Sequence, residues 1–150
     1  MDPKKRPLPP TYFLVAIIVM IAAHLLFPLV TLISTPWRYL GALPLLMGVV
    51  LNLCTDRLFK KYGTEVKPFR DSSALILEGS FRFSRNPMYV GALMILIGIC
   101  LLLGSATPFA VVPIIFWLAT VHFIVPEEGD LERQFGDNYL EYKRRVRRWL

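Results

Sequence analysis

Two short groups of residues in this chain of 150 could form a ligand site. The first is Arg85-Asn86-Pro87, where Asn86 is suited to be an N-cap and Pro87 the first residue of a helix. A helix start of this kind presents free backbone N–H groups, and Arg85 adds a positive charge, so together they favour a carboxylate or a phosphate. The second group is Glu127-Glu128, two adjacent carboxylates that favour a cation.

Both groups also have a structural interpretation. Asn86-Pro87 serves as a helix start without any ligand, and two acids in a first helical turn are explained by the helix dipole. That interpretation does not explain why adjacent carboxylates stand at the end of an apolar stretch, where charge is costly unless a cation is close. A positively charged ligand or Arg85 would be that cation.

Membrane-spanning helices must position these residues. The chain is 55% hydrophobic and 19% charged, with a mean hydropathy of +0.50, which is too apolar for an ordinary soluble domain. Four spans of about 20 residues would leave no room for a separate nucleotide-binding domain. We therefore predict an all-α integral membrane protein with a single domain over residues 1–150.

The spans follow from charge-free stretches. Between Arg85 and Glu127 lie 41 uncharged residues, too many for one span at about 1.5 Å per residue, and the run from Gly104 to Pro108 divides them into a helical hairpin. Four transmembrane helices are predicted, at about residues 12–34, 39–55, 87–103 and 108–125.

Basic residues are concentrated on one side of these spans. The N-terminal tail holds 3 of the 17, the loop 56–85 holds 7 and the tail 126–150 holds 6, whereas the other side has only Arg38. By the positive-inside rule, the protein is multi-pass with both termini and the loop in the cytoplasm. The same asymmetry accounts for the net charge of +6, so we do not expect nucleic-acid binding.

The hairpin brings the two groups of charged residues to one membrane face. Tyr89 adds an aromatic ring about one turn into the helix, and Gly91 lets a backbone or a ligand approach closely. Together with Arg85 and Glu127-Glu128 they would form a small pocket suited to a zwitterionic, positively charged ligand.

The tail is predicted to form one amphipathic helix along the membrane surface, opened by Glu127-Glu128 after Pro126. Its apolar stripe consists of Leu131, Phe135, Tyr139, Tyr142, Val146 and Trp149, and its other face carries Lys143, Arg144, Arg145, Arg147 and Arg148. Taken alone, such a helix is an interfacial anchor.

Other polar residues add little to this picture. Cys54 and Cys100 lie far apart in apolar stretches, so neither a disulfide framework nor a metal site is expected. His24 and His122 lie within predicted spans, where each is either a functional group or a partner in an interhelical hydrogen bond.

The motifs resemble those of the isoprenylcysteine carboxyl methyltransferase and phospholipid methyltransferase family. The resemblance covers about residues 60–148 and rests on residues 75–91 (LILEGSFRFSRNPMYVG), an apolar hairpin, Pro126-Glu127-Glu128, and residues 135–146 (FGDNYLEYKRRV). Order and spacing over roughly 90 residues make it specific, although each piece alone is weak.

The resemblance implies an integral membrane enzyme that transfers a methyl group from S-adenosylmethionine to a lipid or a lipidated acceptor, with the cofactor-binding part at about residues 60–150. A bundle of four spans is thin, which is compatible with a homodimer. The implied cofactor-binding residues are Arg85, Asn86, Pro87, Tyr89, Gly91, Glu127, Glu128, Tyr139 and Tyr142, with Arg85 and Glu128 implied as catalytic.

Asn86 departs from the family pattern, which has His at this position. Asn cannot titrate near neutral pH, so a role in proton transfer would be lost there. Two alternatives stay open. One is a nicotinamide-dependent membrane reductase of related fold, and the other is a non-enzymatic membrane scaffold that binds anionic lipid.

Overall fold

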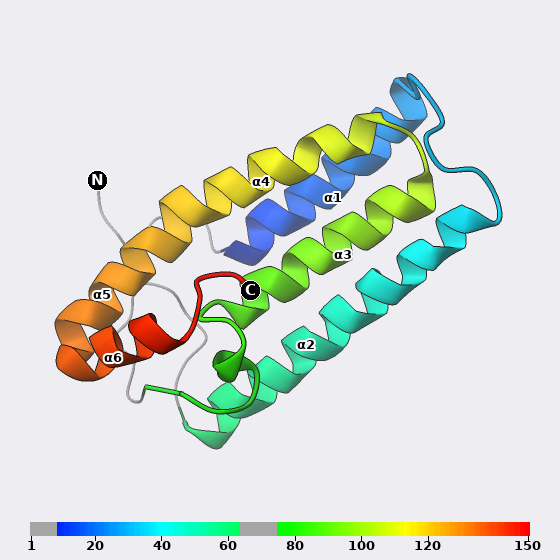
Figure 1. Cartoon of the computed structure of the whole chain (residues 1–150). Coiled ribbons are helices and arrows are strands. Elements are labelled where there is room, and N and C mark those ends of the chain that lie inside the picture. Colours follow the sequence, from blue (N-terminus) through cyan, green and yellow to red (C-terminus); the bar gives the residue numbers. More distant parts are fainter. Residues whose placement is uncertain (1–8, 64–74) are drawn as a thin grey trace.

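The computed structural model describes residues 9–63 and 75–150, and every regular element within them is helical. The elements are α1 (Pro9–Leu26), η2 (Trp37–Gly41), α2 (Ala42–Lys61), η3 (Gly79–Arg82), α3 (Pro87–Leu103), η4 (Thr107–Ala110), α4 (Val111–Ala119), η5 (Thr120–Ile124), α5 (Val125–Phe135) and α6 (Asp137–Arg145). Helices α1 to α4 run side by side, and α6 folds back toward the start of α3 (Figure 1). The all-α prediction is confirmed for the described residues.

Within the described residues, three helical paths are long and apolar enough to cross a membrane: Pro9–Leu26, Trp37–Lys61 and Thr107–Phe135. The remaining predicted span, α3, has the predicted bounds, and at 17 residues it is shorter than these three paths. Large apolar side chains stand exposed along α1 and α2, as is expected of helix faces that contact lipid. The described helices are thus those of an integral membrane protein.

The first helix is shorter than the predicted 12–34, because α1 ends at Leu26. Pro28 cannot donate a helical hydrogen bond, and it disfavours helical geometry in the residue before it. The chain beyond it pairs instead with the α3–α4 connection, where the N–H of Leu32 donates to the carbonyl of Gly104 at 2.8 Å.

The second helical path, Trp37–Lys61, is longer than the predicted 39–55. The prediction covered only the uncharged residues, but the helix continues through charged ones. An ion pair of 2.6 Å between Asp56 and Lys60, one turn apart, supports this extension.

The fourth predicted span, 108–125, is too short, and the prediction that a new helix opens at Glu127 is wrong. The helical path runs without interruption from Thr107 to Phe135. Pro126 lacks an N–H, and its ring would clash with the carbonyl four residues earlier in a regular helix. The helix accommodates it by widening into a π-helical turn, η5, directly before α5.

The tail is two helices and not one. Gly136 separates α5 from α6 with φ +53°, a conformation in which a side chain would be strained. Helix α6 ends at Arg145, and Val146 is extended with ψ 134°. The single apolar stripe predicted from residue 131 to 149 therefore does not exist, and residues 146–150 form a separate segment.

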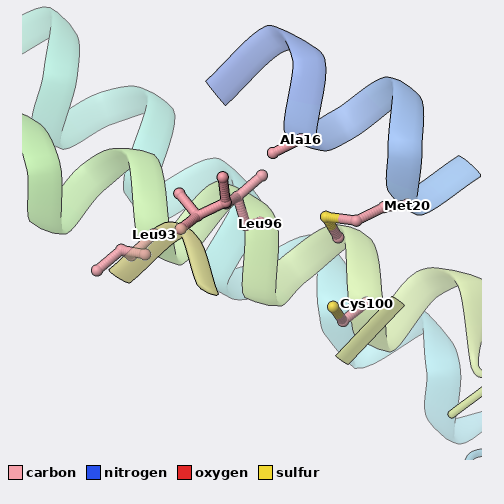
Figure 2. Packing of buried hydrophobic residues seen from close by; sticks show 6 residues of the cluster. Ala16, Met20, Leu93, Leu96 and Cys100 are labelled. Atoms are coloured by element: carbon pink, nitrogen blue, oxygen red, sulfur yellow. The ribbon is translucent and has the colours of Figure 1, made fainter. Parts of the chain in front are cut away.

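Two kinds of packing hold the bundle together. A core cluster joins α1, α3 and α4 through Ala16, Met20, Leu93, Leu96, Cys100 and Ile115. Figure 2 shows Ala16 and Met20 on α1, facing the residues of α3. On its other side, α3 packs closely against α2, with glycines of both helices at the contact. A Cβ added to Gly48 would stand 2.4 Å from the carbonyl oxygen of Gly91, so both positions require glycine.

Candidate functional site

The candidate site is built on the loop that leads into α3. Asn86 occupies the N-cap position and Pro87 the first helical position, as predicted, but the Asn86 side chain makes no capping hydrogen bond. Its Nδ2 donates instead to Glu128 Oε1 at 3.3 Å and to the main-chain oxygen of Arg148 at 3.1 Å. Asn86 therefore connects the start of α3 with α5 and with the 146–150 segment.

Glu128 is the centre of this cluster, and its side chain is only 5% exposed. Arg148 donates to its carboxylate from Nη2 at 2.9 Å and from Nε at 3.1 and 3.2 Å, and Arg85 Nη2 lies 3.4 Å from Oε1. A buried carboxylate needs such partners because it has lost its water. The hydrogen bonds to Glu128 also raise the pKa of Arg148. We call Arg85, Asn86, Glu128 and Arg148 the Glu128 cluster.

Arg85 keeps unused hydrogen-bonding capacity within this cluster. Its side chain is 8% exposed, and its Nε and Nη1 are buried without a hydrogen-bond partner among the described residues. Buried guanidinium N–H groups without acceptors are unfavourable, and a planar carboxylate is the group that matches them best. A ligand carboxylate would supply the acceptors that these two nitrogens lack.

The side chains of the adjacent residues Glu127 and Glu128 point in different directions. Neighbouring helical residues are about 100° apart around the axis, so Glu127 turns away from the Glu128 cluster. Its Oε2 accepts a long hydrogen bond of 3.4 Å from the hydroxyl of Tyr89. The Tyr89 ring lies 6.4 Å from the ring of Phe13 on α1. The predicted pocket is thus divided into two neighbouring parts, one around each carboxylate.

Two buried tyrosines of α6 adjoin the Glu128 cluster. The rings of Tyr139 and Tyr142 lie 6.0 Å apart, inclined at 59°. Tyr142 donates a hydrogen bond to the main-chain oxygen of Phe81 at 2.7 Å. Burial raises the pKa of both phenols above the ordinary value, so both are neutral donors at physiological pH.

Tyr142 also lines a cleft of 530 Å³ between residues 75–82 and the two tail helices. The lining is apolar at Leu75, Leu77 and Phe135, with Arg82, Asn138, Glu141, Arg145 and Val146 completing it. The cleft thus has both apolar and polar or charged walls and can take a ligand that has both kinds of surface.

The remaining predicted residues have structural places. Pro87 is buried at the first turn of α3. Gly91 faces α2, where an added Cβ would stand 2.3 Å from Asn52 Oδ1, so its role is helix packing. His24, in the last turn of α1, has its Nδ1 2.8 Å from Ser105 Oγ in the connection that follows α3, whereas the candidate site lies before α3. His122 is exposed on η5 and packs edge-on against Trp117.

Sequence reasoning missed two residues of the site. Arg148 was placed on the polar face of a continuous helix, whereas the break at Gly136 and the end of α6 bring it onto Glu128. Ser84 accepts a hydrogen bond from the N–H of Asn86 at 3.0 Å and donates one to the Arg148 main chain at 3.2 Å. Gly136, a residue type that ends helices, was the available signal for the first.

Comparison with known proteins defines the class. The model of the family described as phospholipid methyltransferase matches residues 37–138. The chain therefore belongs to this family of membrane methyltransferases.

Individual relatives agree with this membership. The chain is 31% identical over 72 residues to the protein-S-isoprenylcysteine O-methyltransferase of Schizosaccharomyces pombe and 30% identical over 109 residues to that of Xenopus laevis. These matches cover 48% and 71% of this chain but only 30% and 38% of the two relatives. An uncharacterized protein of Haemophilus influenzae is 47% identical over 64 residues, which is 42% of this chain and all of that protein. No solved structure matches the chain.

Proposed function

We propose that the protein transfers a methyl group from S-adenosylmethionine to a lipid or a lipidated acceptor. Family membership supports the reaction class. The observation that carries the donor assignment is the pair of buried, unpartnered Arg85 nitrogens beside the Glu128 carboxylate. These groups are complementary to the two charges of an amino-acid end, because a carboxylate pairs with the guanidinium and an ammonium with the carboxylate.

Each site residue then has a role. Arg85, with the α3 start and Asn86, would hold the methionyl carboxylate, and Glu128 the ammonium. The cleft beside Tyr142 would take the adenosyl part, since its mixed apolar and polar lining and its volume of 530 Å³ fit a nucleoside. Tyr89 and Tyr139 would pack against the donor, and Glu127 would accept from ribose hydroxyls or act on the acceptor.

When bound, S-adenosylmethionine supplies a methyl group that is already strongly electrophilic. The protein therefore has to hold donor and acceptor in line and to exclude water. Burial of Arg85, Glu128 and Tyr139 supports this role, because their positions are fixed by packing and hydrogen bonds. Arg85 and Glu128 are the residues to which we assign catalytic importance.

The acceptor class decides whether a base is needed. The named relatives are isoprenylcysteine O-methyltransferases, and a carboxylate acceptor of that kind is already a nucleophile. A phospholipid amine must lose a proton first. Asn86 cannot take that proton, so an amine acceptor would depend on Glu127, next to Tyr89.

We place the site at the cytoplasmic face of a multi-pass protein with both termini on that side. Arg38 lies on η2, before α2, whereas Lys60 and Lys61 lie at the end of α2 and Arg85 lies directly before α3, which fits the positive-inside rule. The donor-binding part is about residues 60–150. A homodimer would cover some of the exposed apolar face of the bundle.

Calorimetric titration of the protein in nanodiscs with S-adenosylmethionine tests the proposal. Saturable binding is expected, with none for a reduced nicotinamide cofactor. Glu128→Gln should abolish donor binding, while Glu132→Gln, which alters a partly exposed ion pair on the same helix, should not. Binding of the nicotinamide cofactor alone would favour a reductase, and binding of neither a scaffold. An acceptor screen with labelled methyl groups and a membrane lipid extract follows.

A further inference from the structure

The 146–150 segment lies across the candidate donor site as a bound peptide would. The N–H of Arg85 donates to the main-chain oxygen of Arg147 at 3.0 Å, and Ser84 and Asn86 donate to that of Arg148. The Arg148 side chain then pairs with Glu128. Three consecutive residues before α3 thus bind the main chain of this segment. Figure 1 shows the segment reaching the start of α3.

These contacts fill the acceptor capacity of Glu128. A carboxylate has about four lone-pair sites. Oε1 faces Arg85, Asn86 and Arg148 at 3.2 to 3.4 Å, and Oε2 faces two nitrogens of Arg148 at 2.9 and 3.1 Å. A ligand ammonium can therefore reach Glu128 only if one of these partners leaves.

Exposure identifies the partner that can leave. The side chain of Arg85 is 8% exposed, and Asn86 is also 8% exposed, whereas the side chain of Arg148 is 37% exposed. Arg148 can rotate into water without opening the bundle. Departure of the whole segment would in addition free the hydrogen bonds that Ser84, Arg85 and Asn86 donate to its main chain.

The charge balance of the Glu128 cluster also favours the departure of Arg148. The Glu128 cluster holds two guanidinium groups against one carboxylate. A sulfonium amino acid adds one carboxylate and two positive charges, so binding beside Arg148 would raise the local positive charge further. Departure of Arg148 would offset that excess.

We propose that the 146–150 segment is an internal competitor of the methyl donor, and that Arg148 sets donor affinity by occupying the place of the donor's ammonium on Glu128. This inference rests on the proposed function. Trp149 secures the resting position, since its ring stacks on Phe116 with centroids 4.6 Å apart. Donor binding exchanges the Arg148–Glu128 pair for a donor–Glu128 pair.

Titration calorimetry on the full chain in nanodiscs tests the exchange. Arg148→Gln should bind S-adenosylhomocysteine about tenfold more tightly than the unmodified protein, as expected when a competing state is removed. Arg147→Gln is the matched control, because it removes the same charge from the same segment at an exposed side chain. Its affinity should not change. The gain should be absent for 5′-methylthioadenosine, which lacks the amino-acid end.

A second readout follows the segment itself. With Trp37 and Trp117, both exposed, replaced by Phe, Trp149 is the only remaining tryptophan. Its emission should shift to longer wavelength when S-adenosylhomocysteine is added. Equal or weaker binding by Arg148→Gln, or an emission wavelength that stays unchanged while the ligand binds, would contradict the competition between Arg148 and the donor. The proposed function would then still stand. If no variant binds any of these ligands, the proposed function itself fails.

Discussion

The hydroxyl of Tyr142 donates to the main-chain oxygen of Phe81 at 2.7 Å, across 61 positions of sequence. This bond attaches α6 to the loop before α3. Tyr142→Phe would leave the Phe81 carbonyl without this donor, at a cost of about 1 kcal/mol. The thermal midpoint in detergent should fall, and Tyr12→Phe, which keeps the edge-to-face contact of that ring with Phe123, should have little effect.

Alkaline pH should reduce the difference between the unmodified protein and Tyr142→Phe. Burial raises the folded-state pKa of Tyr142 above its ordinary value of about 10. Its contribution to stability is therefore complete below pH ~10 and is lost above it, as the unfolded state ionises first. Thermal midpoints measured from neutral pH to about pH 11 should converge. A constant difference over that range would contradict the role assigned to this phenol.

Arg85→Lys should weaken S-adenosylmethionine binding about 10- to 100-fold. Lysine keeps the charge but lacks the planar fork whose Nε and Nη1 are free in the described structure. Calorimetry gives the affinity, and Arg57→Lys, at an exposed position of α2, is the control. Unchanged affinity in Arg85→Lys would mean that charge alone matters at this position.

Gly48→Ala should destabilise the bundle by roughly 1–3 kcal/mol, the range for overpacking a tight contact. The added Cβ would lie 2.4 Å from the backbone oxygen of Gly91, so α2 and α3 would have to separate. Gly129→Ala is the control, since nothing lies within 4 Å of its added Cβ and alanine favours a helix. Its thermal midpoint should stay level or rise, whereas that of Gly48→Ala should drop.

His24 and Ser105 should show energetic coupling of about 0.5–1.5 kcal/mol in a double-mutant cycle with alanine. Their side chains meet at 2.8 Å, between the last turn of α1 and the connection after α3, whereas the candidate site lies before α3. Donor affinity should be the same in all four proteins. If His24→Ala removed methyl transfer without any loss of stability, a chemical role for this histidine would have to be considered.

Charge and proline patterns predicted part of this structure and not the rest. The bounds of α3 follow from the Asn86-Pro87 start and the Gly104 end, both local signals. The uninterrupted Thr107–Phe135 path was not predictable from Pro126, because whether a helix stops or widens at proline depends on its packing partners.

The contacts of the site likewise include one that the sequence predicts and one that it does not. The meeting of Arg85 with Glu128 follows from the hairpin, since the two ends of a hairpin return to one face. The place of Arg148 depends on the turn at Gly136 and on the extended chain after α6, and periodicity cannot supply either. For a residue that lies outside a helix, the spacing of apolar residues gives no information about its position.

The length of the Thr107–Phe135 path also bears on how deep Glu128 lies in the membrane. From Thr107 to Glu128 the helix rises about 32 Å at 1.5 Å per residue, close to the thickness of a hydrocarbon core. With Thr107 at one boundary of the core, Glu128 would stand at the other, among the lipid headgroups. An acceptor anchored by its acyl or prenyl chain would then present its head at the height of the transferred methyl group and would not have to be extracted from the bilayer.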